Sequence, residues 1–323
     1  MTHLVDTVSF FHIPPVMTHR RAVFLMILAT LLWSIAGVVT RHLEAARSFE
    51  VTFWRSLFNA LALLIALGVW RGAGLWRALL SGGWALWTSG VCWSLMYTAF
   101  LVAMTMTTVA NVLVMIALGP LVTALFSRWI LGHRLPRRTW LAIGAATSGI
   151  AWMYGGEALG GASFLGTLVA SVVPVAAACN WIVLQSVSSR GAMKGEPSVD
   201  MMPAVLIGAL LSAFATFPLA FPFQASLHDV GLLALLGVVQ LAAPCLLVVR
   251  LSRELLAAEI SLYGLLEVIF GVTWAWLWGG ETPPLTTLTG GAMVIAALFL
   301  NELLGLRRRQ RLRTGEMNAG RSF

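Results

Sequence analysis

Charged residues are scarce in this sequence. Asp, Glu, Lys and Arg make up only 11% of its 323 residues, whereas 59% are hydrophobic, and the mean hydropathy is +0.86. Soluble domains carry about 25% charged residues, because a globule must cover its core with groups that water solvates. The shortage of charge therefore excludes a soluble fold and indicates that lipid surrounds most of the chain.

Motifs of catalysis, metal binding and nucleotide binding are also missing. The sequence contains no G-x-x-x-x-G-K-[ST] loop, no H-E-x-x-H and no G-x-S-x-G. Cys92, Cys179 and Cys245 lie in apolar stretches without C-x-x-C or Cys/His spacing, so they are predicted to be buried free thiols. We expect neither an enzyme nor a resident metal or cofactor.

What the sequence does contain is a series of long apolar stretches. A helix needs about 20 apolar residues to cross the hydrocarbon core of a bilayer, and ten such stretches predict an all-α protein with ten transmembrane helices. The predicted spans are Ala22–Thr40, Val51–Trp70, Trp84–Met104, Thr107–Leu131, Thr139–Tyr154, Phe164–Val187, Met201–Ala220, Val230–Val249, Ala257–Trp278 and Leu285–Leu304. Residues 1–20 lack the order of a cleavable signal peptide and are expected to be a disordered cytoplasmic leader.

The basic residues indicate the orientation of these spans. With the amino terminus in the cytoplasm, all of the 21 Lys and Arg residues except Arg41, Arg47, Arg55 and Arg128 fall in inner loops or in the carboxy-terminal tail. Cytoplasmic loops carry the excess of Lys and Arg in membrane proteins, so both termini are predicted to be cytoplasmic. The net charge of +8 is then an orientation signal, and nucleic acid is not an expected partner.

The two halves of the sequence resemble each other at an offset of 148 residues. Trp33 corresponds to Trp181 and Pro136 to Pro284, and the predicted spans coincide in the two halves. Each unit holds five spans, an odd number, so the second copy enters the membrane from the opposite side. The sequence therefore predicts two inverted-topology five-helix repeats, residues 21–155 and 156–306, followed by a basic cytoplasmic tail, residues 307–323.

Four stretches carry a family resemblance. The segment A-N-V-L-V-M-I-A-L-G-P-L-V-T-A-L-F-S-R-W-I-L-G-H-R-L-P at Ala110–Pro136 and its repeat partner from Ala258 resemble the ends of the EamA domains of the drug/metabolite transporter superfamily. Leu31–Arg41 and Phe53–Ser56 resemble the opening of that domain. The resemblance implies a ten-helix bundle that exports small metabolites. It also implies a central cavity lined by the first, third, fourth, sixth, eighth and ninth spans, with the fifth and tenth at the periphery.

One acid lies midway along a predicted span. Glu267 is about ten residues from either end of the ninth span, and Glu259, Tyr263 and Glu267 share one helix face at i, i+4 and i+8. A central charge costs about 2.5–3.5 kcal/mol on insertion scales. The favoured interpretation is a lining that meets a substrate amine or carries a proton, with Glu267 as the proton-coupling residue. The alternative is a protonated or hydrogen-bonded Glu267 that holds helices together.

Further polar and aromatic groups lie at membrane depth. Asn111, Met115 and Gly119 share a face of the fourth span beside Pro120, and Pro174 and Pro244 are predicted to interrupt the sixth and eighth spans. The amides Asn180 and Gln240 are also consistent with interhelical hydrogen bonds. The full set of predicted cavity residues is Trp33, Trp93, Tyr97, Asn111, Met115, Asn180, Trp181, Gln240, Tyr263 and Glu267.

These observations predict a secondary transporter of the bacterial-type inner membrane, a monomer or weak homodimer. The predicted cavity contains one carboxylate and no deep cation apart from Arg55 near the outer end of its span. That composition suits amino acids, amines or related small metabolites better than polyphosphates, which require paired cations. We expect export by alternating access. The alternative is a membrane channel or scaffold without coupled transport.

Overall fold

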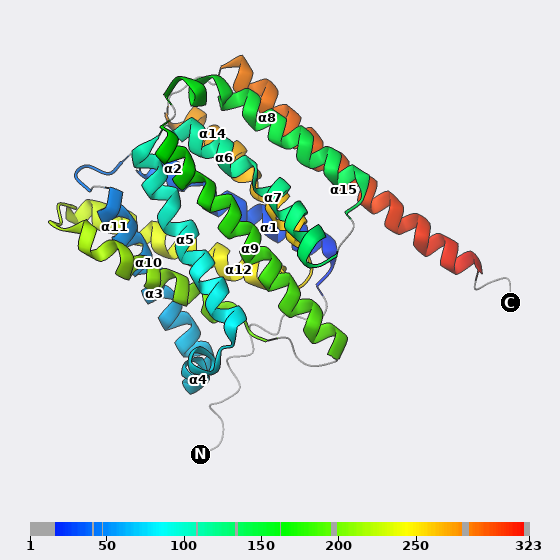
Figure 1. The fold of residues 1–323 in the computed structure, drawn as a ribbon, viewed down its shortest axis with the longest axis horizontal. Coiled ribbons are helices and arrows are strands. Elements are labelled where there is room, and N and C mark those ends of the chain that lie inside the picture. Colours follow the sequence, from blue (N-terminus) through cyan, green and yellow to red (C-terminus); the bar gives the residue numbers. More distant parts are fainter. Residues whose placement is uncertain are drawn as a thin grey trace.

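The structure, a computed structural model, describes residues 17–40, 42–46, 48–107, 109–132, 135–161, 163–194, 199–279 and 284–319. Throughout these residues the regular structure is helical (Figure 1). Residues 1–16, most of the predicted leader, lie outside the described part. The helices are α1 (His19–Ser34), α2 (Ala36–Thr40), α3 (Ser48–Arg71), α4 (Ala73–Ser81), α5 (Trp84–Met106), α6 (Val109–Ala117), α7 (Gly119–Ile130), α8 (Arg137–Gly161), α9 (Phe164–Lys194), α10 (Met202–Ala220), α11 (Leu227–Leu235), the π-helical segment η1 (Leu236–Ala242), α12 (Ala243–Leu251), α13 (Ala257–Gly264), α14 (Leu266–Gly279) and α15 (Leu285–Ala319).

Eight helical stretches among the described residues are long and apolar enough to cross a membrane. They coincide with the first four predicted spans and with the sixth to the ninth, so the chain is a multi-pass membrane protein. The fifth and tenth predicted spans correspond to α8 and α15, where Leu285–Asn301 forms a shorter apolar stretch. Helix α8 continues to Gly161, past the predicted end of its span at Tyr154.

Helices α8 and α15 lie side by side along one edge of the molecule (Figure 1). Glycine allows this close approach, because a Cβ atom on Gly149 would lie 2.8 Å from the carbonyl oxygen of Gly290. Small residues at such contacts let helix backbones pack directly in lipid, where no hydrophobic effect drives association. The position of this pair at the edge agrees with the peripheral fifth and tenth spans that the resemblance implies.

Several spans are broken near their middle. Turns at Ile35, Leu118 and Leu265 separate α1 from α2, α6 from α7 and α13 from α14. Pro120 explains the second break, because it occupies the first turn of α7 and has no N–H to continue the preceding helix. The breaks at Leu118 and Leu265 lie at nearly corresponding positions of the predicted repeat.

The remaining prolines differ in their effect. Pro244 is the second residue of α12, which directly follows the π-helical segment η1, so the α-helical hydrogen bonding of the eighth span is interrupted there although the helical stretch Leu227–Leu251 is continuous. Helix α9 instead runs without interruption from Phe164 to Lys194 with Pro174 inside it. The prediction of an interrupted sixth span was therefore wrong. The surrounding turns of a membrane helix keep their own hydrogen bonds, and neighbouring helices pack around the proline.

Helix α10 packs tightly against both α3 and α5. A Cβ atom on Gly208 of α10 would lie 2.9 Å from the carbonyl oxygen of Gly90 of α5. The Ser212 hydroxyl of α10 lies 3.0 Å from the Ser56 hydroxyl of α3 and 2.9 Å from the Thr98 hydroxyl of α5. These contacts fix the positions of two helices, α3 and α5, that carry side chains of the site described below.

Two acids organise the loops at the end of the bundle that is predicted to face outward. The Glu50 carboxylate accepts hydrogen bonds from the backbone N–H groups of Gln224 and Ala225 at 3.0 and 2.8 Å. The Asp229 carboxylate accepts from Glu44, Ala45, Ala46 and Ser226 N–H groups at 2.8 to 3.4 Å. Both side chains are buried, and each supplies acceptors to backbone that no helix satisfies.

Candidate functional site

Polar and aromatic side chains from both halves of the chain meet in the middle of the bundle. Helices α3 and α5 contribute from the first half, and α9, η1, α12 and α14 from the second. We call this group the central cluster, and its members are Arg55, Asn59, Trp93, Tyr97, Trp181, Gln240, Cys245 and Glu267.

Three aromatic rings in contact form one side of the central cluster. The rings of Trp93 and Tyr97, one turn apart on α5, lie 5.6 Å apart and nearly parallel. Trp181 of α9 meets Trp93 edge to face at 5.5 Å. All three are buried, with Trp93 only 3% exposed. The sequence predicted each of them as a cavity residue, and the structure brings them together.

A hydrogen bond joins the two halves beside this wall. The Tyr97 hydroxyl donates to the Cys245 sulfur of α12 at 3.3 Å. These residues are 148 positions apart, the same offset as the predicted repeat. Trp33 of α1 also approaches the Cys245 thiol. When two units are related by a two-fold axis, a residue can contact its own counterpart only where the axis passes. The contact between Tyr97 and Cys245 is therefore where such an axis would pass.

Arg55 belongs to the interior of the bundle. It lies two turns into α3 and is only 4% exposed. Its Nη2 donates to the carbonyl oxygen of Tyr97 at 3.4 Å, while Nε has no hydrogen-bond partner among the described residues. Sequence reasoning placed Arg55 near the outer end of its span and outside the predicted cavity set. Its i, i+4 spacing with Asn59 on an apolar helix was the available signal.

Glu267 is half-buried and lies within electrostatic reach of Arg55. The two side chains lie close enough to attract each other electrostatically, and both also act on Cys245. Glu267 lies in the first turn of α14, directly after the break at Leu265. The N-terminal end of a helix carries partial positive charge, which stabilises a carboxylate placed there.

Several buried polar atoms of the central cluster lack hydrogen-bond partners among the described residues. They are Arg55 Nε, both amide atoms of Asn59, Trp93 Nε1 and Gln240 Oε1. Asn59 is 0% exposed and lies beside the Tyr97 hydroxyl, but its amide makes no hydrogen bond of good geometry. Burying such a group unpaired costs about 1–3 kcal/mol. Their concentration in one place makes the central cluster the candidate site.

Gln240 connects the eighth span to the broken first span. Its Nε2 donates to the carbonyl oxygen of Trp33 at 3.1 Å, near the end of α1. The residue lies in η1, and π-helical segments occur frequently at functional sites because the extra residue re-aims a side chain. One end of the amide thus makes an interhelical hydrogen bond, as the alternative interpretation proposed, while Oε1 points to no described partner.

The other predicted cavity residues contact different partners. Asn111 donates to the hydroxyls of Thr107 and Thr167 at 3.0 and 2.8 Å, which ties α6 to α9. Asn180 accepts from the Ser89 hydroxyl at 2.6 Å and so links α9 to α5. These contacts give both amides an interhelical role, which was the alternative stated for Asn180.

Met115 and Tyr263 belong to apolar surroundings. Met115 packs against a small group of buried residues that includes Ala103 and Ala170, while Tyr263 of α13 is part of the main core. Glu259, on the same predicted face, accepts a hydrogen bond from the Leu256 N–H at 3.0 Å and thereby caps the start of α13. The described role of the Glu259 side chain is therefore to cap a helix.

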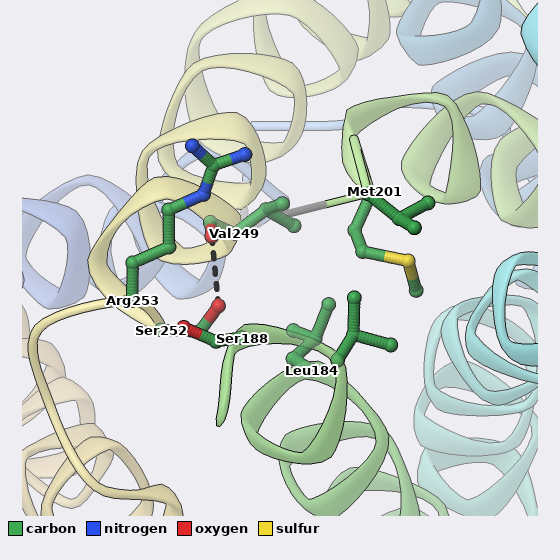
Figure 2. A pocket seen from close by; sticks show the side chains of 8 residues that line it. Leu184, Ser188, Met201, Val249, Ser252 and Arg253 are labelled. Atoms are coloured by element: carbon green, nitrogen blue, oxygen red, sulfur yellow. Dashed lines mark hydrogen bonds between the residues drawn. The ribbon is translucent and has the colours of Figure 1, made fainter. Parts of the chain in front are cut away.

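A small opening lies at the end of the bundle that is predicted to face the cytoplasm (Figure 2). Its volume is about 10 Å³, room for about one water molecule. Ser252 donates to the carbonyl oxygen of Val249 at 2.8 Å along its wall, and the Arg253 side chain extends above (Figure 2). The lining residues are Leu184, Val187, Ser188, Val199, Met201, Val249, Ser252 and Arg253.

One group of ionisable residues has spacing compatible with a metal ion. Ligand atoms of Glu44, His228 and Asp229 lie within 4.8 Å of one another at the outer end. The Asp229 oxygens already accept four backbone hydrogen bonds, and Glu44 and His228 are exposed. This group fits its structural role in the loops better than it fits a metal site.

Comparison with known proteins adds three findings. Residues 20–155 match the model of the EamA-like transporter family. The chain is 24% identical over 279 residues to the pseudopaline exporter CntI of Pseudomonas aeruginosa, in strain UCBPP-PA14 and in strain PAO1, and the match covers 86% of this chain and 94% of that protein. A solved crystal structure shares the fold with a TM-score of 0.69 at 20% identity, covering 90% of this chain and 99% of that one.

Proposed function

Since the chain is an EamA transporter of the drug/metabolite transporter superfamily, with an EamA domain over residues 20–155 and an exporter as its homologue, we propose that it exports small organic metabolites by alternating access. The substrates are amino acids, amines or related compounds. The central cluster is the substrate site, and the protein resides in a bacterial-type inner membrane with both termini in the cytoplasm.

The observation that carries this proposal is the central cluster itself. Hydrogen-bonding groups without partners are concentrated beside broken helices, and both halves of the chain supply them. Carriers built from repeats bind substrate near the middle of the membrane, at the interface between the repeats and on discontinuous helices. The broken helices and the contribution of both halves to the central cluster support this proposal.

The ten-span inverted repeat is part of the same proposal. The breaks at Leu118 and Leu265 and the Tyr97–Cys245 hydrogen bond support it, because each relates the two halves at an offset of 147 or 148 residues. Rocking of one unit against the other would then expose the central cluster to each side in turn.

Transport into proteoliposomes tests the function. We expect purified protein to exchange amino acids or organic amines in a counterflow assay, with a rate that saturates as substrate concentration rises. A channel would instead conduct without saturation, and a scaffold would show no flux. Wild-type protein that moves no member of a broad metabolite panel would contradict the proposal.

Glu267 is the proposed proton-coupling residue. The ionisable groups within electrostatic reach of it are Arg55 of α3 and Cys245 of α12, and the Tyr97 hydroxyl of α5 donates to Cys245. Glu267→Gln keeps the shape and hydrogen bonding of the side chain and removes its titration. We expect folded protein whose transport is strongly reduced and nearly independent of pH. Transport with unchanged rate and pH dependence would exclude this role, and Glu44→Gln, an exposed acid, is the matched control.

A further inference from the structure

We propose that α4 is a membrane-surface helix, which inserts Trp76 and Leu80 among the lipids of the bilayer face on which it lies and binds anionic headgroups through Arg77. The inference concerns the short connection between the second and third predicted spans, not the central cluster, and it goes beyond the proposed transport activity. The partner of this surface is the lipid bilayer.

The place of α4 in the chain puts it at the membrane surface. It joins α3 to α5, two helices that are long and apolar enough to cross a membrane. Its nine residues span about 14 Å, too little to cross a hydrocarbon core of about 30 Å. Figure 1 shows α4 nearly end-on at the ends of α3 and α5, crosswise to both. The helix therefore runs along the end of the bundle that is predicted to face the cytoplasm.

Glycines form both corners of this connection. Gly72, directly before α4, has a φ of +51°, which glycine adopts without the strain that a Cβ atom would cause. Gly82 and Gly83 separate α4 from α5. The chain thus turns sharply on either side of α4, and the helix crosses the ends of its neighbours instead of continuing one of them.

The side chains of α4 divide into distinct faces, because residues i and i+4 of a helix lie on the same side. Leu75 is only 1% exposed and belongs to the main core, and Leu79 packs against that core. Trp76 and Leu80 lie on the neighbouring face and are 58% and 88% exposed. Since Leu75 fixes the rotation of the helix against the bundle, this apolar face points away from the protein.

Exposed tryptophans lie on both sides of α4 in the sequence. Tryptophan is enriched where a membrane meets water, because its ring is apolar and its N–H is polar. Within residues 70–87 the end of α3, α4 itself and the start of α5 each supply such side chains, about half exposed or more, namely Trp70, Trp76, Trp84 and Trp87. Their position indicates that the membrane interface lies at the level of α4.

Arg77 supplies the charge of this surface. Its side chain is exposed and has no acidic partner in the described part of the chain, whereas Arg71 forms an ion pair with Asp200. Helices that lie in a bilayer interface carry Arg or Lys on the polar face and Trp or Leu on the apolar face. Arg77 directly follows Trp76, so a lipid held against the apolar face brings its phosphate to the guanidinium group, which binds phosphates through paired hydrogen bonds.

Fluorescence quenching on single-cysteine variants tests the position of α4. In full-length protein with the three native cysteines replaced by alanine, Leu80→Cys carries a fluorophore on the apolar face and Ser81→Cys on the polar face. Ile65→Cys, at an exposed position inside α3, is the lipid reference. In phosphatidylcholine nanodiscs, lipids brominated in their acyl chains should quench the label at residue 80 nearly as well as the label at residue 65. Aqueous iodide should quench the label at residue 81 most strongly.

The label at residue 80 also tests the headgroup. In nanodiscs of equal parts phosphatidylglycerol and phosphatidylcholine, brominated phosphatidylglycerol should quench it more than brominated phosphatidylcholine. We expect a local preference of about fivefold, the factor for one cation beside an anionic membrane surface. Arg77→Gln should remove most of this preference. Arg128→Gln, a change at an exposed arginine in the last turn of α7, is the matched control and should keep it.

Three outcomes would overturn the inference. Equal quenching of the labels at residues 80 and 81 by iodide would show that α4 lies in water. Protection of the label at residue 80 from both iodide and brominated lipid would show that protein, such as a second copy of the chain, covers the apolar face. An unchanged preference for phosphatidylglycerol in Arg77→Gln would show that Arg77 does not bind the headgroup.

Discussion

The outer end of the bundle and the central cluster both bury charged and polar side chains, but the two regions differ in how these side chains are hydrogen-bonded. At the outer end the Asp229 carboxylate accepts four backbone hydrogen bonds, and the Glu50 carboxylate accepts from two backbone N–H groups and from Trp54 Nε1. In the central cluster Arg55 Nε, Asn59 and Trp93 Nε1 have no partners among the described residues. Satisfied polar groups stabilise a fold, whereas unsatisfied ones cost stability and mark a candidate site.

The comparison predicts the largest loss of stability at Asp229. Asp229→Ala removes the acceptor for four N–H groups in loops that have no other described partners for them. We expect the free energy of unfolding to fall by about 2–4 kcal/mol. Thermal unfolding of the purified protein measures this. Transport per folded molecule should stay near the wild-type rate, because the site itself is unchanged.

An exposed neighbour provides the control for that prediction. Glu44→Ala removes an acid from the same outer region, but its side chain is exposed and its contribution to stability should stay within about 0.5 kcal/mol of zero. Equal stability of Asp229→Ala and wild-type protein would show that the outer hydrogen bonds do not hold the loops.

Asn59 should show the opposite behaviour. Asn59→Leu replaces a buried amide that has no described partner by an apolar group of similar volume, so we expect stability to stay equal or to rise by about 1 kcal/mol. Transport should fall by about tenfold or more, since a polar contact of the site is lost. Asn111→Leu is the matched control, because the Asn111 amide donates to Thr107 and Thr167, and this change should destabilise the protein. Destabilisation by Asn59→Leu would mean that its amide is structural.

The smallest effect is expected at Tyr97. Tyr97→Phe removes one hydrogen bond, from the hydroxyl to the Cys245 sulfur, and keeps the ring that stacks on Trp93. Hydrogen bonds between membrane helices contribute about 0.6 kcal/mol on average. The free energy of unfolding should therefore change only slightly, and the transport rate by about threefold at most. Complete loss of transport in Tyr97→Phe would show that the Tyr97 hydroxyl contacts the substrate and does not serve only to join two helices.

Hydropathy predicted much of this fold, because lipid leaves few alternatives to long apolar helices. Eight predicted spans coincide with apolar helices of membrane-spanning length. The turn at Leu118 followed from Pro120, whereas the break at Leu265 has no proline to announce it. The π-helical segment η1 likewise has no pattern that a sequence scan detects, because it depends on how neighbouring helices pack around it.

The site was harder to predict than the spans. Glu267 entered the predicted cavity because no side chain so far from the ends of its predicted span reaches water. Arg55 was left out because a position two turns from a helix end is compatible with a side chain that extends to the surface. The packing of α3 against α5 and η1 places Arg55 in the interior. That packing depends on residues far apart in the sequence. Gly237 of η1, for example, lies against the backbone of Arg55.

The most direct test of the central claim uses Cys245 as the only cysteine. Cys245 is fully buried in the central cluster, and Cys92→Ala with Cys179→Ala leaves it as the sole thiol. In vesicles of known orientation, an impermeant thiol reagent should label Cys245 from either side of the membrane. A transported substrate should change the ratio of the labelling rates from the two sides. Labelling from one side alone under every condition, in protein that still transports, would contradict alternating access through this cluster.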